Sequence, residues 1–451
     1  MSSTSDILIV SASINILDTD SGNTDITTSK LNGRTPVLAI FAIRFQPLGD
    51  SSGITGIGAC DGTNEFCVCI AAEDDANASD VKMNRSTAAC LEAIDPQSTG
   101  QGSIEYQANF VSFIADGVRL NVTTTPERTM GFSVMFFAGD DLEIEIGSFT
   151  ADAAAASTNT LNFGGGITQW DLLIGARTGD QADNISNNHA YSLGFLSRLG
   201  GNSTGQCVHT SSDDAAGTSI VTYGVFDTEF LRVIDPVSTD AWSISRTGSS
   251  DTSITFTKDE DDYTASDVFD YIAIGMAGNG GIADLIDTPT SAVVDWDVTG
   301  LGFKAHAMFA HPSAITSANR NTTVATAGDG HGFSPHFWDS AGAGGRFTGV
   351  GVKFTEEDNV ATTHVSQGIN TGGNIGQAFN DADGLFMSLG NPSISLASRF
   401  NTDGWKVVAA DISIANATAR SFLYMAFGEP DEHLLFRDDA LKFVSQPQLR
   451  M

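Results

Sequence analysis

Basic residues are scarce in this chain of 451 residues. It has 22 Lys and Arg against 55 Asp and Glu, which gives a formal net charge of −33. A surface with that excess of negative charge repels nucleic-acid phosphates and anionic lipid headgroups. The composition therefore argues against nucleic acid and membrane surfaces as partners, and it predicts a soluble protein that attracts cations.

Long apolar runs and a secretory leader pattern are also missing. No apolar stretch approaches the roughly 18 residues that a membrane helix needs. The first residues, Met-Ser-Ser-Thr-Ser-Asp, show neither the basic region nor the apolar core of a signal peptide. We expect a protein that is made in a cytoplasm and leaves the cell, if at all, by lysis.

Residues typical of exposed helix surfaces are few, whereas glycine (47) and phenylalanine (28) are abundant. Short apolar stretches with alternating polarity, such as Val118, Leu120 and Val122, are separated by turn residues along most of the chain. Alternation with a period of two is typical of a strand with one buried face. The composition and this pattern predict strands joined by many turns.

One segment occurs twice at a separation of 140 residues. Residues 91–99 read Leu-Glu-Ala-Ile-Asp-Pro-Gln-Ser-Thr, and residues 231–239 read Leu-Arg-Val-Ile-Asp-Pro-Val-Ser-Thr. The pair Cys67-Val68 recurs as Cys207-Val208 at the same separation. Self-similarity at a fixed period indicates one module used repeatedly, and this period is close to the usual size of a domain.

A third copy follows the first two. Each copy opens with an apolar strand, at 36–45, 170–177 and 301–309. A glycine-containing turn is expected after each of these strands, at 57–62, 193–198 and 331–336. We therefore predict an all-β protein made of three tandem antiparallel β-sandwiches of jelly-roll or lectin-like type, produced by internal triplication.

The copies predict the following division of the chain. Residues 1–35 form an N-terminal arm, 36–150 the first sandwich, 151–167 a linker, 168–290 the second sandwich, 298–430 the third, and 431–451 a C-terminal arm. The five cysteines, an odd number, lie in the first two copies at unequal counts (Cys60, Cys67, Cys69, Cys90, Cys207). A disulfide framework would repeat in every copy, so we expect buried free thiols.

Clusters of acidic residues follow one strand of each copy. Carboxylates beside carbonyl-rich turns supply the hard oxygen ligands that calcium prefers, although adjacent acidic residues are commonly just solvated turn charges. Calcium is thus the one cofactor that the sequence suggests, and its candidate ligands are Glu73, Asp74, Asp75, Asp213, Asp214, Glu356, Glu357 and Asp358.

Aromatic residues near the predicted turns give a second kind of candidate site. Trp338 and Trp405 could stack on sugar rings, together with Phe195, Phe333 and Phe337, or the same rings could fill the core. Five of the eight histidines lie in the third copy, where a metal or pH-sensing site is an alternative to ordinary histidines (His306, His311, His331, His336, His364).

The ends of the copies resemble tandem modules of virion proteins from tailed bacteriophages. In these modules an Asp-Gly turn leads into an apolar strand, and a second apolar strand ends in glycine. The resemblance rests on residues 113–122 with 130–139 and on 400–408 with 423–428, and the second copy departs from it with Asp251-Thr252. The resemblance implies a structural or surface role in a phage particle and supplies no active-site residues.

We accordingly expect a non-enzymatic structural protein of a virion, either a capsid decoration (cement) protein or a tail or fibre component. Its partners would be other virion proteins and copies of itself, with no nucleic acid or membrane and with a surface glycan as one option. Two other functions fit the same sequence, a carbohydrate-binding phage adhesin and a polysaccharide-degrading enzyme. No constellation of residues points to a catalytic site.

Overall fold

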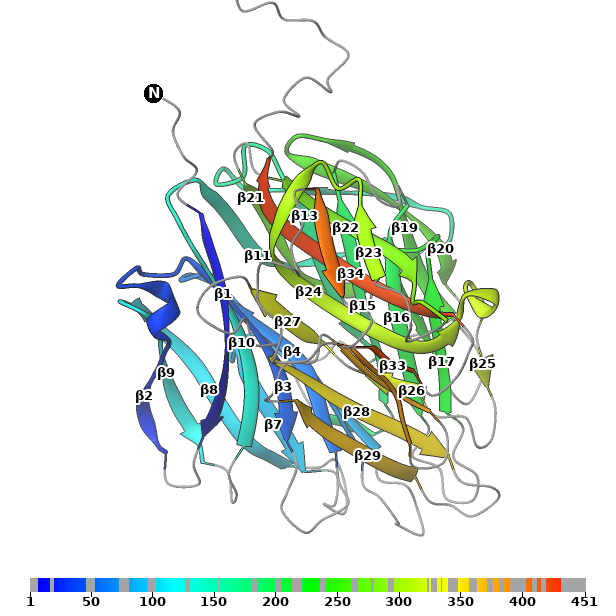
Figure 1. Ribbon diagram of the computed structural model, residues 1–451, viewed down its shortest axis with the longest axis horizontal. Helices are drawn as coiled ribbons and strands as arrows, with labels where there is room; N and C mark the ends of the chain where they lie inside the picture. Colours follow the sequence, from blue (N-terminus) through cyan, green and yellow to red (C-terminus); the bar gives the residue numbers. More distant parts are fainter. Residues whose placement is uncertain are drawn as a thin grey trace, which may run out of the picture.

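The computed structural model consists of strands and short turns (Figure 1). It describes residues 7–430 except for 17–19, 46–52, 73–80, 96–102, 126–129, 153, 180–184, 188, 199–203, 213–220, 236–240, 262–266, 277–279, 291–295, 323, 326–330, 334, 340–347, 357–362, 371–375, 381–383, 390–402, 408–411 and 415–418. Helical structure within the described residues is limited to two 3-10 turns, η1 (Ser29–Leu31) and η2 (Ser317–Asn319). The prediction of an all-β protein is confirmed.

The first part of the chain forms one large and one small antiparallel sheet. The first large sheet has the order β1 (Leu8–Ile16), β10 (Met130–Ala138), β3 (Leu38–Phe45), β4 (Gly53–Cys60), β5 (Glu65–Ala72), β6 (Val81–Ser86) and β14 (Ile185–Asn187). The first small sheet has the order β2 (Gly22–Thr27), β9 (Gly117–Thr124), β8 (Ser103–Ile114) and β7 (Leu91–Asp95).

The middle part repeats this arrangement. The second large sheet has the order β11 (Leu142–Thr150), β21 (Val268–Met276), β13 (Leu172–Thr178), β15 (His189–Ser197), β16 (Gln206–Ser212), β17 (Val221–Phe226) and β25 (Val324–Ala325). The second small sheet has the order β12 (Thr158–Asn162), β20 (Ser253–Asp261), β19 (Ala241–Ser250) and β18 (Leu231–Ile234).

The last part forms a third large sheet and two smaller ones. The third large sheet contains β22 (Gly280–Asp287), β34 (Arg420–Pro430), β24 (Phe303–Thr316), β27 (His336–Asp339), β28 (Thr348–Glu356) and β26 (His331–Phe333), with β29 (Thr363–Asn370) also paired to β28. The smaller sheets are β23 (Trp296–Thr299) with β32 (Gly404–Val407), and β30 (Gly376–Asn380) with β31 (Gly384–Leu389) and β33 (Ile412–Ile414).

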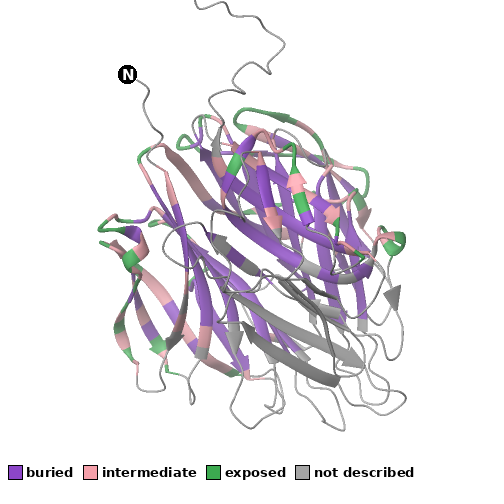
Figure 2. Ribbon diagram, viewed as in Figure 1, coloured by how far each residue is buried: buried purple, intermediate pink, exposed green. Residues whose placement is uncertain are grey.

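The three large sheets meet in one apolar cluster, which we call the central core. Side chains from all three contribute to it, and aromatic rings make the contacts between sheets. The ring centroids of Phe137 and Phe427 are 5.2 Å apart, and those of Phe195 and Phe309 are 4.9 Å apart. Figure 2 shows buried strands through the middle of the molecule and more exposed hairpins at its edge.

The opposite face of each large sheet packs on a smaller sheet through a separate apolar cluster. Strands of the large sheets are therefore buried on both faces, and all seven residues of β13 are buried. Strands of the small sheets have one wet face, and β12 alternates between exposed and buried residues. This difference explains why β3, β13 and β34 read as nearly continuous apolar runs whereas β9 and β20 alternate.

The first and second large sheets share the same register. Gly58 lies opposite Cys67, which lies opposite Ser86; likewise Gly194 lies opposite Cys207, which lies opposite Phe226. The separation of 140 residues in the sequence thus corresponds to the same place in two sheets.

The turns predicted at 57–62 and 193–198 are wrong, because most of these residues belong to β4 and β15. The glycines Gly58 and Gly194 allow the backbone of another chain segment to pass close to the strand. A Cβ atom on Gly58 would lie 1.9 Å from the carbonyl oxygen of Cys90, and one on Gly194 would lie 1.7 Å from that of Phe230. Only a residue without a side chain fits at these two positions.

Segments predicted outside the sandwiches take part in the sheets. Residues 1–35, predicted as an arm, contain β1 and β2, and the predicted linker 151–167 contains β12. The strands β11 and β22, predicted at the ends of the first and second copies, pair with β21 and β34 of the following copy. The predicted C-terminal arm, 431–451, lies outside the described residues.

Candidate functional site

The predicted calcium ligands are not placed by the structure. Seven of the eight, Glu73, Asp74, Asp75, Asp213, Asp214, Glu357 and Asp358, lie outside the described residues. Glu356 is the last residue of β28, and its side chain is likewise not described. Within the described part of the chain, no group of three or more His, Cys, Asp or Glu side chains is arranged to hold a metal ion.

Of the two alternatives for Trp405, stacking on a sugar or filling the core, the structure supports the second, because its side chain is fully buried. Trp405 lies on β32, and its ring packs edge-on against Trp296 at 4.9 Å and Tyr424 at 5.5 Å. Phe195 and Phe337 are also fully buried in the central core. Trp338 lies on β27 and Phe333 on β26, but their side chains lie outside the described part of the structure.

The five cysteines are free and fully buried, as predicted. Burial raises the pKa of the Cys67, Cys90 and Cys207 thiols well above the ordinary value. A buried thiol held in its neutral form is a poor nucleophile.

Among the five histidines near the end of the chain, His311 is buried and His306 is half-buried. The side chains of His331, His336 and His364 lie outside the described part of the structure.

Buried ion pairs between the large sheets are the first notable polar feature. Arg85 on β6 of the first large sheet makes two parallel contacts with Asp270 on β21 of the second, Nε to Oδ2 and Nη2 to Oδ1, both at 2.7 Å. The Ser148 hydroxyl donates to Asp270 Oδ1 at 2.6 Å. This bidentate geometry fixes the register of one sheet against the other.

A buried carboxylate joins the third large sheet to β1 of the first and to Lys30 of η1. Asp339 at the end of β27 is fully buried, and its Oδ2 accepts from the Ser11 backbone N–H at 2.8 Å and the Ser11 hydroxyl at 2.5 Å. Lys30 Nζ donates to the same oxygen at 2.8 Å. The buried carboxylates of Asp270 and Asp339 thus hold large sheets together, the first through Arg85 and the second through Ser11 and the partly exposed Lys30.

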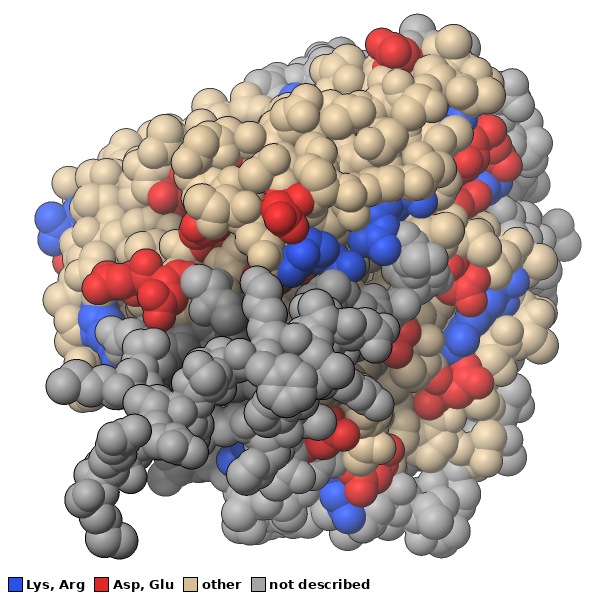
Figure 3. All heavy atoms as spheres, turned by 90° about the horizontal axis from the view of Figure 1, so that it is seen from above, with Lys and Arg blue, Asp and Glu red and all other residues tan. Residues whose placement is uncertain are grey.

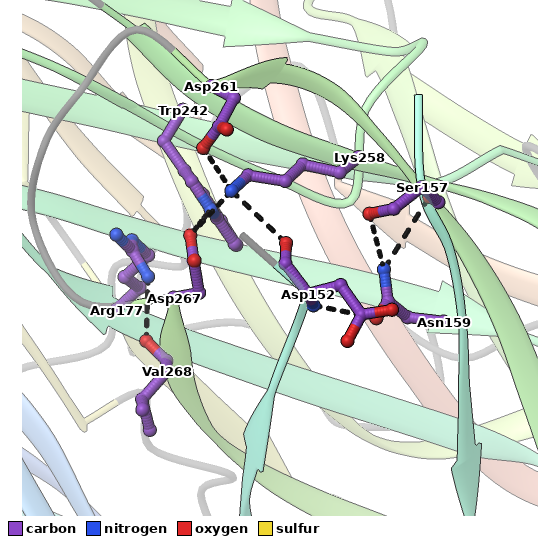
Figure 4. A network of polar contacts seen from close by, with 9 residues as sticks. All are labelled: Asp152, Ser157, Asn159, Arg177, Trp242, Lys258, Asp261, Asp267 and Val268. Carbon is purple, nitrogen blue, oxygen red and sulfur yellow. Dashed lines mark hydrogen bonds and ion pairs between the residues drawn. The ribbon is translucent and has the colours of Figure 1, made fainter. Parts of the chain in front are cut away.

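The largest internal charged group lies between the second large sheet and its small sheet (Figure 4). We call it the Lys258 cluster, and its members are Lys258, Asp261, Asp267, Trp242 and Arg177. Lys258 Nζ contacts Asp261 Oδ1 and lies 2.7 Å from Asp267 Oδ1, and the Lys258 side chain is 0% exposed. Trp242 Nε1 donates to Asp267 Oδ1 at 2.9 Å. The Arg177 guanidinium lies 3.8 Å from the centre of a Trp242 ring and donates to the Val268 carbonyl at 2.8 Å.

A β-bulge in β20 turns Asp261 to the side of the strand on which Lys258 lies. Lys258 lies opposite Ile244 and Glu260 lies opposite Ser243, so Asp259 is an extra residue in β20. An extra residue reverses the alternation of faces, and Asp261 therefore points inward beside Lys258.

The first pair of sheets has apolar residues where the second has these charges. The strand register places Val122 of the first small sheet at the position that Lys258 has in the second. Val122 lies opposite Ala108 in the first small sheet, just as Lys258 lies opposite Ile244 in the second. By the same reasoning Ile43 corresponds to Arg177, and both Val122 and Ile43 are buried in an apolar cluster. The fold therefore does not require charge at these positions.

Sequence reasoning missed these residues, although a signal was present. In β20 the inward positions are Ile254, Phe256 and then Lys258, so a charged residue occupies a core position of the alternation. Arg177 and Asp270 likewise interrupt strands that are otherwise apolar on both faces. Charges at such positions predict buried ion pairs.

The Asp-Gly pairs at 116–117 and 403–404, which belong to the segments that resemble phage modules, have a clear local role. Asp116 Oδ1 accepts from the Gly33 N–H at 2.5 Å, and Asp403 accepts from the Gly302 N–H at 2.6 Å and the Gly300 N–H at 3.0 Å. In both cases the carboxylate belongs to the residue directly before a strand of the small sheet, β9 or β32, and ties it to the segment that leads into the large sheet. In the second copy the side chain of Asp251 pairs with Arg198 instead.

The described surface offers little apolar area. Val111 is the one large hydrophobic residue that is exposed among the described residues. In Figure 3, acidic and basic side chains lie beside one another in small patches on an otherwise uncharged face.

A polar hollow of about 240 Å³ lies between β5 and β11, lined by Thr63, Asn64, Glu65, Phe66, Thr87, Ile146, Gly147 and Ser148.

Arg232 on β18 is shared by two carboxylates, Glu229 Oε1 at 2.7 Å and Glu260 Oε2 at 2.8 Å. Burial raises the pKa of Glu229 to about 7, although Arg232 acts in the opposite direction. A carboxyl whose pKa is raised by folding stabilises the folded state fully below its unfolded pKa, and this contribution is lost as the pH rises through its folded pKa.

Replacing Glu229 by Gln is expected to make the stability less sensitive to pH. Gln has the same shape as the protonated acid and does not ionise. The free energy of unfolding of the wild type should therefore fall by about 3 kcal/mol relative to the Gln variant between about pH 4.5 and pH 8. Urea titrations of both proteins across this range measure the difference, and a difference that does not change with pH would contradict the assignment.

Comparison with known proteins gives no match: no family model fits the chain, and no curated protein and no solved structure shows significant similarity to it. Among the residues that the structure describes, no helix is long and apolar enough to span a membrane.

Proposed function

We propose that this chain is a non-enzymatic structural protein of a virion, in which three related β-sandwiches form one building block of a tailed-phage particle. The observation that carries the proposal is the central core, where the three large sheets bury one face each against the others. Symmetric particles are built from closed oligomers, and a chain of this kind would replace a trimer.

The triplication that we propose follows the strand pairing. The first unit would run from β1 to β10, the second from β11 to β21 and the third from β22 to β34; the first two each have a large and a small sheet, and the third has a large sheet and two smaller ones. Short strands exchanged between neighbours support this division. β14 pairs with β6 of the first large sheet, and β25 pairs with β17 of the second.

Contacts with other virion proteins would use sheet edges and loops. The described surface exposes almost no large apolar residue, which disfavours an apolar docking face there. The first and second small sheets, in contrast, each have one edge strand with exposed residues, β2 and β12, whose outer backbone groups can pair with a strand of a neighbour. The net charge of −33 would keep assembled particles dispersed and would disfavour contact with nucleic acid.

The burial of Trp405 in a core weakens the adhesin alternative. Of the two tryptophans proposed to bind a glycan, Trp338 is the one that remains a candidate. The hydrolase alternative would need a pair of carboxylates flanking a sugar. Neither alternative is favoured by a specific contact of the described residues.

Imaging of purified particles tests the proposal. We expect the chain at a fixed and high copy number, at a symmetry-related position, with other virion proteins at its sheet edges. A purified chain should bind no oligosaccharide on a glycan array and release no reducing ends from polysaccharides. Absence from the particles, or saturable glycan binding that is lost in Trp338→Ala, would contradict the proposal.

A further inference from the structure

The Lys258 cluster brings together an amine and carboxyl groups that could form a covalent cross-link. An amine and a carboxyl group that are held in contact away from water can condense to an amide, with water as the other product. We propose that Lys258 Nζ forms an isopeptide bond with the side chain of Asp267. This inference does not depend on the proposed function.

The geometry brings the reacting atoms together. Lys258 Nζ lies 2.7 Å from Asp267 Oδ1, so the amine is in direct contact with the carboxyl group that it would attack. The Lys258 side chain is 0% exposed, and that of Asp267 is 15% exposed. Lys258 lies on β20, and Asp267 is the residue directly before β21.

The neighbours of the pair supply the other parts that condensation needs. Trp242 Nε1 donates to Asp267 Oδ1 at 2.9 Å, so it can stabilise the negative charge that develops on this oxygen when the amine attacks. Asp261 Oδ1 contacts Lys258 Nζ and can accept a proton from it. The Asp152 carbonyl oxygen, 3.3 Å from Nζ, orients the amine.

The step balances without any further reactant. A proton passes from the Lys258 ammonium to Asp261, and the neutral amine attacks the carboxyl carbon of Asp267. The C–N bond forms, Asp261 returns the proton to Oδ2, and Oδ2 leaves as water with the second proton of the amine. An ammonium and a carboxylate in a poorly solvated interior are replaced by a neutral amide, which removes the desolvation cost of two charges.

The position of the proposed bond indicates what it would do. β20 belongs to the second small sheet and β21 to the second large sheet, so the amide would join the two layers covalently. The first pair of sheets has Val122 at the position of Lys258 and no such option there. The cross-link would distinguish the second pair of sheets from the first.

Mass spectrometry of the purified full chain tests the proposal. We expect an intact mass that is lower than the sequence mass by one water. Trypsin should not cut after Lys258, so residues 247–304, which have no other Lys or Arg before Lys304, should appear as one peptide lacking one water. An intact mass equal to the sequence mass, with cleavage after Lys258, would overturn the proposal and leave an ion pair.

Two variants check the assignment. Lys258→Arg keeps the positive charge but cannot form the amide, so its mass should equal its sequence mass and trypsin should cut at position 258. Asp267→Ala should also have its full sequence mass. Loss of one water in either variant would overturn the assignment of the bond to Lys258 and Asp267, and the wild-type mass stands as a test even if a variant does not fold.

Discussion

Replacing Arg85 by Ala is expected to destabilise the protein by about 3–5 kcal/mol, because it leaves the carboxylate of Asp270 buried without its ionic partner. Asp270 is fully buried, and only 8% of the Arg85 side chain is exposed. The pair joins the first and second large sheets, so its loss should weaken their packing. Urea denaturation of the wild type and the variant measures the effect.

The chain offers a matched control for this prediction. Arg119 makes a similar bidentate contact with Asp25 at 2.6 and 2.8 Å, but the two side chains are 41% and 43% exposed. Because exposed pairs contribute little, Arg119→Ala should change the stability far less than Arg85→Ala. The double variant Arg85→Met with Asp270→Leu should recover most of the lost stability. Equal effects of the two Arg→Ala changes would refute the role of burial.

Gly194→Ala is expected to lower the free energy of unfolding by at least about 3 kcal/mol. The added Cβ would lie 1.7 Å from the backbone oxygen of Phe230, so β15 or the segment before β18 must move. Gly58→Ala should behave in the same way, because its Cβ would lie 1.9 Å from the Cys90 oxygen. Thermal and urea unfolding of the purified variants measure both effects.

Gly165→Ala is the control for the glycine variants. A Cβ on Gly165 meets no atom within 4 Å, and the backbone there is not left-handed. Its effect on stability should stay within about 0.5 kcal/mol. If Gly194→Ala were as mild as Gly165→Ala, the close approach of the two chain segments would be disproved.

The sequence predicted the strand content, and it contained a match at a separation of 140 residues that corresponds to equivalent places in two sheets. Strand alternation follows from sheets with one wet face, as in β9 and β20, and the separation of 140 residues matches the shared register around Cys67 and Cys207. Both signals are patterns in the sequence itself, so they can be recognised without knowledge of the packing.

Errors arose where packing between sheets decides the outcome. Gly58 and Gly194 look like turn residues, but a passing backbone requires them within strands. Trp405 follows a turn in the sequence and yet packs against Trp296, which precedes it by more than a hundred residues. The partner of Arg85 is likewise on another sheet. Such contacts depend on how distant segments meet, which a single sequence does not specify.

Calorimetric unfolding of the intact chain is the most direct test of the claim that three large sheets share one core. Because Phe309 packs against Phe195 of another sheet, Phe309→Ala should shift the unfolding of the whole molecule. We predict one cooperative transition that moves as a unit in this variant, with equal calorimetric and van't Hoff enthalpies. Separate transitions for the three parts of the chain, with only one of them shifted by Phe309→Ala, would contradict a shared core.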